Sequence, residues 1–149
     1  MTGGINIYFA GPLFSIAERE FNLRLAKFLK AELGGVINLP QQFSANIFGQ
    51  PDFIERAFKY SLESIDKCDA VIAILDGPDV DAGTCVEIGY AFAKKKPIIG
   101  LRTDFRASED RGMNLMVSMS CTHLIWSENI KARQTEVFRT VVDTARSLT

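Results

Sequence analysis

The sequence is poor in the residues that several common kinds of active site need. It has a single histidine, His123, among 149 residues, so a metal centre built from several histidines is excluded. The three cysteines are widely spaced and odd in number, which argues against a disulfide framework and a zinc knuckle. We therefore expect a protein of a reducing compartment, the cytoplasm. If it is an enzyme, its chemistry should belong to carboxylates, with no metal and no cofactor.

Charge and hydropathy exclude further classes of protein. The net charge is -1 and no long basic run is present, so nucleic-acid binding has little support. The apolar runs are too short to cross a bilayer, and the first residues lack the positive stretch of a signal peptide. With 47% hydrophobic and 23% charged residues, the composition predicts one globular domain over residues 1–149.

One stretch, DAVIAILDGPDVDAGTCVEIG at residues 69–89, organises the rest of the chain. Its apolar run at residues 70–75 predicts a buried parallel strand, and Gly83 and Thr84 then open a helix that carries Glu87. In an open α/β sheet, ligands bind outside the carboxyl ends of the strands. The turn between strand and helix lies there, and it presents three carboxylates: Asp76, Asp79 and Asp81.

Two interpretations of Glu87 compete. Thr84 and Glu87 have the spacing of a capping box, in which the two residues only complete the start of the helix. Alternatively, Glu87 lies in the first turn and faces the cleft, where the positive end of the helix dipole keeps it ionised as a nucleophile. The spacing alone favours the capping box.

The order of predicted elements defines the fold class. Strands are predicted at residues 5–10, 36–39, 70–75, 97–101 and 122–126, and helices at residues 17–33, 53–67, 84–95 and 129–148. In the helix at 53–67, the inward residues are expected to be Ile54, Ala57, Phe58, Leu62 and Ile65. Residues 41–52 and 102–112 are predicted to be irregular loops. This alternation predicts an α/β fold: a flavodoxin-like, doubly wound, five-stranded parallel sheet with helices on both faces.

The motifs that could carry chemistry are specific in combination. No G-x-G-x-x-G, no P-loop and no acidic residue follows the first strand, so dinucleotide binding and a phospho-receiver are not indicated. Four segments in order resemble the nucleoside 2-deoxyribosyltransferase family over most of the chain. They are I-Y-F-A-G-P-x-F at residues 7–14, C-D-A-V-I-A at 68–73, D-x-G-T-x-x-E-I-G at 81–89 and N-L-M at 114–116.

The resemblance implies a retaining, two-step transfer of 2-deoxyribose through a covalent Glu87 intermediate. Tyr8 would orient Glu87, and Asp81 would meet the nucleobase and help to protonate it. Phe14 would line the pocket, and Gln42 would bond the base, although Gln41 could take that role instead. The remaining residues expected to bind substrate are Ala10, Gly11, Asp76, Gly83, Asn114 and Met116.

The resemblance also implies partners and leaves alternatives open. Asn114 and Met116 would reach into a neighbouring subunit's site, so a homo-oligomer, either a dimer or a hexamer, is expected; otherwise this segment is a short core-capping turn. Some relatives carry an additional acid near the position of Ser61, which leaves the base preference open. Asp76 or Asp79 could replace that acid, or simply form a turn.

Two other functions compete with the transferase. An N-glycosidase that hydrolyses deoxynucleosides or their 5′-monophosphates would have a similar architecture. However, the residues after the first strand, GPLFSI, are apolar, which favours a free 5′-hydroxyl over a phosphate. A non-catalytic nucleotide-binding module would keep Glu87 only as a cap. Small-molecule substrates are expected in each case, with no nucleic acid or membrane as partner.

Overall fold

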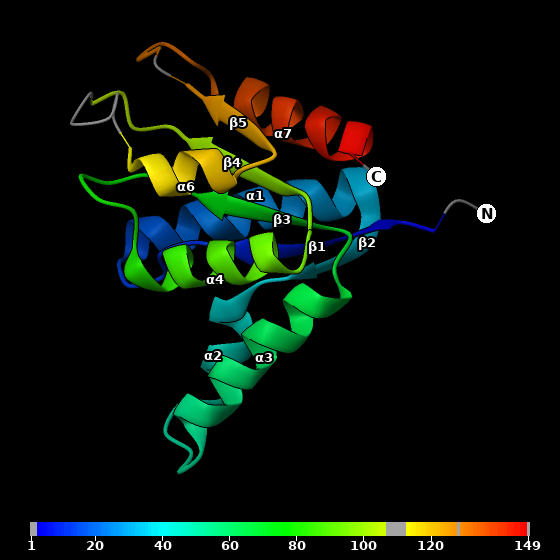
Figure 1. Cartoon of the computed structure of the whole chain (residues 1–149), viewed down its shortest axis with the longest axis vertical. Coiled ribbons are helices and arrows are strands. Elements are labelled where there is room, and N and C mark those ends of the chain that lie inside the picture. Colours follow the sequence, from blue (N-terminus) through cyan, green and yellow to red (C-terminus); the bar gives the residue numbers. More distant parts are fainter. Residues whose placement is uncertain (1–2, 107–112, 128, 149) are drawn as a thin grey trace.

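The computed structural model describes residues 3–106, 113–127 and 129–148. Five parallel strands form one sheet in the order β2-β1-β3-β4-β5 (Figure 1). The strands are β1 (Ile5–Ala10), β2 (Gly34–Asn38), β3 (Ala70–Ile74), β4 (Ile98–Arg102) and β5 (His123–Trp126). The predicted fold class is therefore confirmed. The strand order reverses between β1 and β3, and in such sheets this switch point is where ligands bind.

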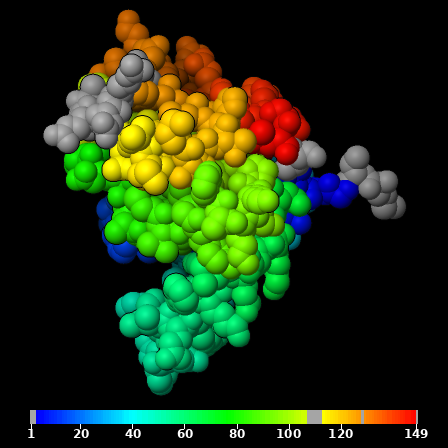
Figure 2. Space-filling view, in the orientation of Figure 1, coloured from blue at the N-terminus to red at the C-terminus, as the bar shows by residue number. Residues whose placement is uncertain are grey.

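Helices cover both faces of the sheet. The first face carries α1 (Ile16–Leu33) and α7 (Gln134–Leu148), and the second carries α4 (Ala82–Ala93) and α6 (Leu115–Ser120). The helices α2 (Pro40–Ile47) and α3 (Phe53–Lys67) pack together and project from one end of the sheet. Figure 2 shows this α2–α3 arm as a separate lobe of the surface. Among the described residues, no helix has the length and apolar character needed to span a membrane.

Alternation along β1 places one tyrosine on the face that carries α4. Ile7 and Phe9 point into the core under α1 and α7, whereas Tyr8 and Ala10 point into the core under α4. Successive side chains of a strand project to opposite faces, so this assignment follows from the register of β1. Tyr8 is completely buried, and its side chain points toward α4 because it lies on that face of the sheet.

The prediction of an irregular loop at residues 41–52 is wrong in its first half, where α2 forms. Pro40 occupies one of the first two helical positions, a place where a missing N–H has no consequence for the helix. The ring of Phe43 stacks on Tyr60 of α3, with ring centroids 4.0 Å apart. This contact joins residues far apart in sequence, and the short segment alone has no regular apolar spacing that would reveal a helix.

Two residues expected on the inward side of α3 are instead exposed. Ile54 is 78% exposed and Phe58 is 61% exposed, whereas Ile65 is buried as predicted. The reason is geometric: the first half of α3 extends beyond the sheet with the α2–α3 arm, so its apolar face has no core to meet within this chain (Figure 1).

The predicted loop at residues 102–112 begins one residue too early. Arg102 is the last residue of β4 and is only 1% exposed. Its guanidinium group is buried because nearby backbone carbonyl groups accept its hydrogen bonds. Thr103 through Arg106 follow outside regular structure, and residues 107–112 lie outside the described part of the chain.

The other boundaries shift by a few residues. The last helix begins at Gln134 rather than at residue 129, because Asn129 starts a turn in which its carbonyl accepts the Ala132 N–H at 2.8 Å. The helix packs Phe138, Val141 and Val142 into the core. The helix after β3 begins at Ala82 rather than Thr84, a difference that changes the interpretation of Glu87.

Candidate active site

A hydrogen bond between β1 and α4 forms the centre of the site. The Tyr8 hydroxyl donates to Glu87 Oε1 at 2.6 Å. Tyr8 is fully buried and Glu87 is partly exposed, so one side of the carboxylate is held by the protein and the other faces outward. The pair lies on the α4 face of β1, the strand that borders the switch point. Sequence reasoning named both residues, and the fold brings them together.

The surroundings of this pair set which group carries a charge. Burial raises the pKa of Glu87 to about 7; hydrogen bonds from Tyr8 and Ser61 oppose this rise, and the charge of Asp81 adds to it. Burial also raises the pKa of Tyr8 far above its ordinary value, with the Glu87 charge adding to the effect. Tyr8 therefore remains a hydrogen-bond donor at all ordinary pH values, while Glu87 changes its charge near neutrality.

Glu87 does not cap α4, so the capping-box interpretation is wrong. The N-cap residue is Asp81, whose Oδ2 atom accepts the Thr84 N–H at 2.9 Å and the Thr84 hydroxyl at 3.1 Å. Thr84 is therefore the N3 residue and Glu87 lies in the second turn. Aspartate is a better N-cap than threonine, which accounts for a helix that begins after Asp81. Gly83 lies exposed in the first turn, where a Cβ atom would approach Asp81 Oδ2 to 3.2 Å.

Ser61 is a member of the site whose place sequence reasoning missed. Its side chain lies on α3 close to Glu87 and Tyr8, and its hydroxyl group lowers the pKa of both. The position was expected to lie near the nucleobase, as the counterpart of an acid in some relatives, and not beside the nucleophile. The available signal was spacing: Ser61 precedes the buried Ile65 by one helical turn, on the inward face of α3.

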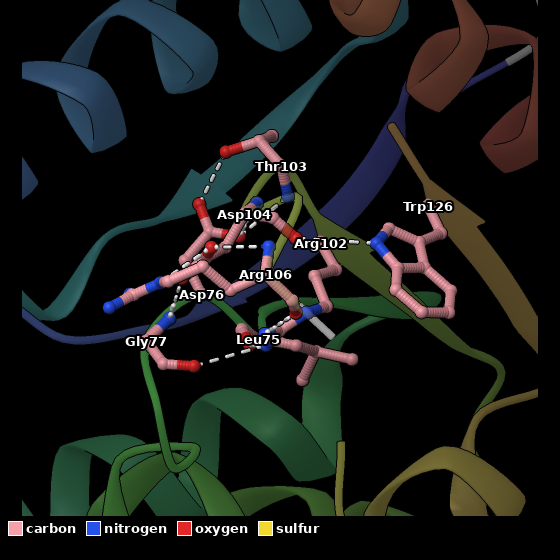
Figure 3. Close-up of polar contacts among 8 residues, drawn as sticks. All are labelled: Leu75, Asp76, Gly77, Arg102, Thr103, Asp104, Arg106 and Trp126. Atoms are coloured by element: carbon pink, nitrogen blue, oxygen red, sulfur yellow. Dashed lines mark hydrogen bonds and ion pairs between the residues drawn. The ribbon is translucent and has the colours of Figure 1, made fainter. Parts of the chain in front are cut away.

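Asp76 is engaged by the neighbouring strand. Its carboxylate accepts hydrogen bonds from the Thr103 N–H and hydroxyl, both at 2.5 Å, and from the Asp104 N–H at 3.0 Å. These bonds tie the turn after β3 to the turn after β4 (Figure 3). A direct contact between Asp76 and a substrate stays a prediction.

The residues after β1 lie at the same edge of the sheet. Ala10 is buried, and Gly11 packs so closely that a Cβ atom there would lie 3.1 Å from Ile74 Cγ1. Phe14 is 73% exposed in this single chain. Its predicted place in a pocket wall therefore requires something that covers it, either a substrate or another subunit.

The two glutamines of α2 differ in their surroundings. The Gln41 side chain is bound internally: it donates to the Arg19 carbonyl at 2.9 Å and accepts from the Asn22 amide at 3.1 Å. Gln42 is exposed and borders a hollow of about 460 Å³ together with Leu23 and Val36. The internal bonds of Gln41 leave Gln42 as the more available of the two, and its contact with a base stays a prediction.

Asn114 and Met116 lie at the start of α6. Asn114 caps α6, because its Oδ1 atom accepts the Met116 N–H at 2.9 Å and the Val117 N–H at 3.4 Å. The Met116 side chain is 74% exposed. Both border a hollow of about 390 Å³ beside α4 that Tyr8 and Glu87 do not line. Within the described part of the chain, no group of three or more His, Cys, Asp and Glu residues could hold a metal ion.

Comparison with known sequences gives one consistent result. Residues 7–116 match the family model described as nucleoside 2-deoxyribosyltransferase. A nucleoside deoxyribosyltransferase of Limosilactobacillus fermentum is 26% identical over 127 residues, which cover 78% of this chain and 76% of that protein. An uncharacterized protein of Ureaplasma parvum is 30% identical over 128 residues, or 74% of this chain and 78% of the relative. An uncharacterized Schizosaccharomyces pombe protein is 36% identical over 76 residues, and the match spans only 33% of its length.

Solved structures share the fold. A conserved protein from Enterococcus faecalis V583 is similar with a TM-score of 0.76 and 25% identity, covering 99% of this chain and 100% of that one. A 2-deoxyribosyltransferase from Bacillus psychrosaccharolyticus gives a TM-score of 0.68 at 23% identity, over 88% and 94% of the two chains. A CMP N-glycosidase from Clostridium botulinum gives 0.61 at 22% identity, over 91% and 96%. The last two likenesses show the fold alone.

Proposed function

Because the chain belongs to the nucleoside 2-deoxyribosyltransferase family, we propose that it exchanges the nucleobase of 2′-deoxynucleosides through a covalent intermediate on Glu87. The observation that carries the proposal is the 2.6 Å hydrogen bond from Tyr8 to Glu87. A partly exposed carboxylate, oriented by a buried donor at the switch point of the sheet, has the properties of a nucleophile. A residue that only stabilised the helix would not need this partner.

The reaction consists of two displacements at the anomeric carbon of the sugar. Glu87 attacks this carbon with one carboxylate oxygen, the bond from the carbon to the base nitrogen breaks, and its electron pair leaves with the base. Asp81 meets the departing base and helps to supply its proton. A nitrogen of the second base then attacks the same carbon, its proton passes to Asp81, and the bond from the carbon to Glu87 breaks, which restores both carboxyl groups. Two inversions give overall retention, as in retaining glycosidases. No metal or cofactor takes part in this scheme.

The turn after β1 supports a nucleoside over a nucleoside monophosphate as donor substrate. The N–H groups of Phe14 and Ser15 at the start of α1 both donate to the Glu18 carboxylate, at 2.9 and 2.6 Å. Backbone donors at a helix start commonly bind phosphate, but these are already bonded to an internal anion. A free 5′-hydroxyl, which needs no such site, is the better fit.

The assay for this proposal is base exchange with purified protein. Deoxyinosine is incubated with adenine or with cytosine, and the products are separated by chromatography. We expect formation of deoxyadenosine in proportion to the adenine supplied, and the cytosine reaction reports whether pyrimidines are accepted. Release of hypoxanthine at the same rate with and without an acceptor would instead identify an N-glycosidase, which is the second candidate function. The absence of both reactions would refute the proposal.

We further propose that the working enzyme is a homo-oligomer in which Asn114 and Met116 serve a neighbour's site. Three observations support this. Both residues border a hollow that their own Tyr8 and Glu87 do not line; Met116 is largely exposed; and the apolar residues Ile54 and Phe58 of α3 are exposed in the single chain. Large exposed apolar groups of this kind mark contacts between proteins.

Mixing two inactive variants tests this arrangement. Asn114→Ala should weaken donor binding, and Glu87→Ala should remove chemistry. If sites are shared between subunits, co-refolded mixtures regain up to about one quarter of wild-type activity, because a mixed pair contains one site with both residues intact. Separate proteins assayed side by side serve as the control. A wild-type protein that sediments as a fully active monomer would contradict shared sites.

The sugar preference gives a separate prediction. A 2′-hydroxyl withdraws electrons from the developing oxocarbenium ion, and it would have to find a partner beside Glu87 and Tyr8. A hydroxyl left without a partner costs about 1–3 kcal/mol. We expect kcat/KM for inosine to be at least about tenfold lower than for deoxyinosine, or roughly 1.4 kcal/mol of discrimination. Initial rates with a common acceptor measure this ratio, and equal rates would show a general pentosyl transferase.

A further inference from the structure

A buried arginine joins the two turns that follow β3 and β4. Arg102 is 1% exposed, and its Nη1 atom donates to the Leu75 carbonyl at 2.7 Å and to the Gly77 carbonyl at 3.2 Å. Its Nη2 atom donates to the Arg106 carbonyl at 3.2 Å. Figure 3 shows the guanidinium group lying between the two turns. One side chain therefore holds backbone atoms of both.

A second set of bonds crosses between the same turns. Asp76 accepts from the Thr103 N–H and hydroxyl and from the Asp104 N–H. In return, Asp104 accepts the Gly77 N–H at 3.3 Å and pairs with Arg106. We name Asp76, Arg102, Thr103 and Asp104 the β3–β4 clasp. It fixes both the N–H and the carbonyl group of Gly77.

The energetic setting of Arg102 is unusual for a residue that only stabilises a fold. Within the part of the chain that the structure describes, no carboxylate forms an ion pair with it, and its buried Nε atom has no hydrogen-bond partner. Burying a cation in this way is unfavourable compared with an apolar side chain of similar size. A conformational role for the arginine would account for its presence better than a contribution to stability.

The turn that the clasp holds needs external support. Gly77 has a φ of +114°, a conformation that glycine adopts freely and other residues rarely do. The same turn carries Asp76, Asp79 and Asp81, whose negative charges repel one another. The bonds from the guanidinium group to the Leu75 and Gly77 carbonyls select one backbone conformation from the many that glycine allows.

We propose that Arg102, acting through the β3–β4 clasp, positions the turn from Leu75 to Asp81 so that Asp81 meets the nucleobase. The inference rests on the proposed function, in which Asp81 contacts the base. Asp81 follows Gly77 closely in the chain and caps the helix that bears Glu87. A weaker clasp would displace Asp81 relative to Glu87 and so lower affinity for the base, while Tyr8 and Ser61 would still hold Glu87.

The only tryptophan of the chain provides a readout that does not depend on activity. The Trp126 indole N–H donates to the Asp104 carbonyl at 3.3 Å, so the ring is attached to the clasp. Release of Asp104 should increase contact between the indole and water. Fluorescence emission should then move to longer wavelength.

Thr103→Val is the most conservative test. It removes the hydroxyl donor to Asp76, retains the size of the side chain and leaves the backbone bond in place. Thr122→Val is the matched control, since the Thr122 hydroxyl accepts the Ile98 N–H at 3.0 Å at the opposite edge of the sheet. We expect Thr103→Val to raise KM for the acceptor base about fivefold and, because Asp81 also helps to protonate the departing base, to lower kcat by up to about fivefold. The emission maximum of Trp126 should shift. The pH below which activity falls, which reports the ionisation of Glu87, should stay the same. Thr122→Val should change none of these quantities.

Arg102→Lys and Arg102→Met test the arginine itself. Lysine keeps the charge but cannot span both turns, so the Arg102→Lys variant should have a KM and an emission maximum between those of wild type and Arg102→Met. If Arg102→Met does not fold, Arg102→Lys and Thr103→Val are enough to test the proposal. The proposal is overturned if Thr103→Val matches Thr122→Val in KM and emission, even when both lose stability. If the wild-type protein exchanges no base, the proposed function fails. The clasp is then judged by direct binding of adenine, which must weaken in Thr103→Val together with the emission shift.

Discussion

Glu87→Ala is expected to abolish base exchange while leaving the fold intact. The loss should appear in kcat and exceed about a thousandfold, because the covalent step has no other nucleophile at the position that Tyr8 addresses. Chromatographic exchange assays at saturating donor and acceptor measure it. Mass spectrometry of the wild-type protein, quenched with acid during turnover, should show a mass increase of one deoxyribosyl unit that the variant lacks.

The control for this variant is Glu63→Ala, which removes a glutamate of α3 that forms exposed ion pairs with Lys59 and Lys67. It should retain full activity. Glu87→Ala should keep α4 intact, because Asp81 and not Glu87 caps this helix, although the buried Tyr8 hydroxyl then loses its partner at a cost of about 1–3 kcal/mol. Substantial exchange by Glu87→Ala would overturn the mechanism.

The second large effect concerns pH. Burial raises the pKa of Glu87 to about 7, and only the ionised carboxylate can attack the sugar. Activity is therefore expected to fall as the pH decreases through about 7, about tenfold for each further pH unit. The profile of kcat/KM reports this group in the free enzyme. An acid limb near the ordinary value of 4.5 would contradict the buried environment of Glu87.

Tyr8→Phe tests the cause of this profile. Tyr8, Ser61 and Asp81 are the polar groups that influence Glu87, and Tyr8 and Ser61 favour its charged form. Removing the Tyr8 hydroxyl should raise the pKa of Glu87, move the acid limb upward and reduce kcat about 10- to 100-fold. Tyr90→Phe is the matched control, because that hydroxyl bonds Asp66 at 3.1 Å instead. An unchanged acid limb in Tyr8→Phe would exclude the orienting role.

The same shift predicts how stability depends on pH. Folding favours the protonated form of Glu87, so the folded protein loses stability as pH rises from 4.5, where the carboxyl of an unfolded chain ionises, to about 7. Glu87→Gln has no such group. The difference in melting temperature, Glu87→Gln minus wild type, should therefore increase as the pH rises from 4.5 to about 7 and stay constant above that range. Melting curves across this range provide the measurement, and parallel curves would contradict it.

Local sequence patterns determined the architecture of this protein. The apolar run at β3 and the alternation of strands and helices were sufficient to predict the parallel sheet, because burial on both faces requires continuous apolar residues. The apolar patterns of single strands and helices are read from residues close in sequence, whereas Tyr8 and Glu87 were named together by the resemblance of their motifs to a known family.

Tertiary structure alone decided the features that depend on distant residues. Helix α2 is stabilised by Phe43 stacking on Tyr60, a residue that lies on another helix. Arg102 is polar and follows an apolar strand, so its burial could not be foreseen until the carbonyl groups of another turn were in place to receive it. Ser61 likewise acquired its partners when α3 packed against β1 and α4. A polar side chain is buried only where the fold supplies its hydrogen bonds, and a sequence does not state which distant groups will supply them.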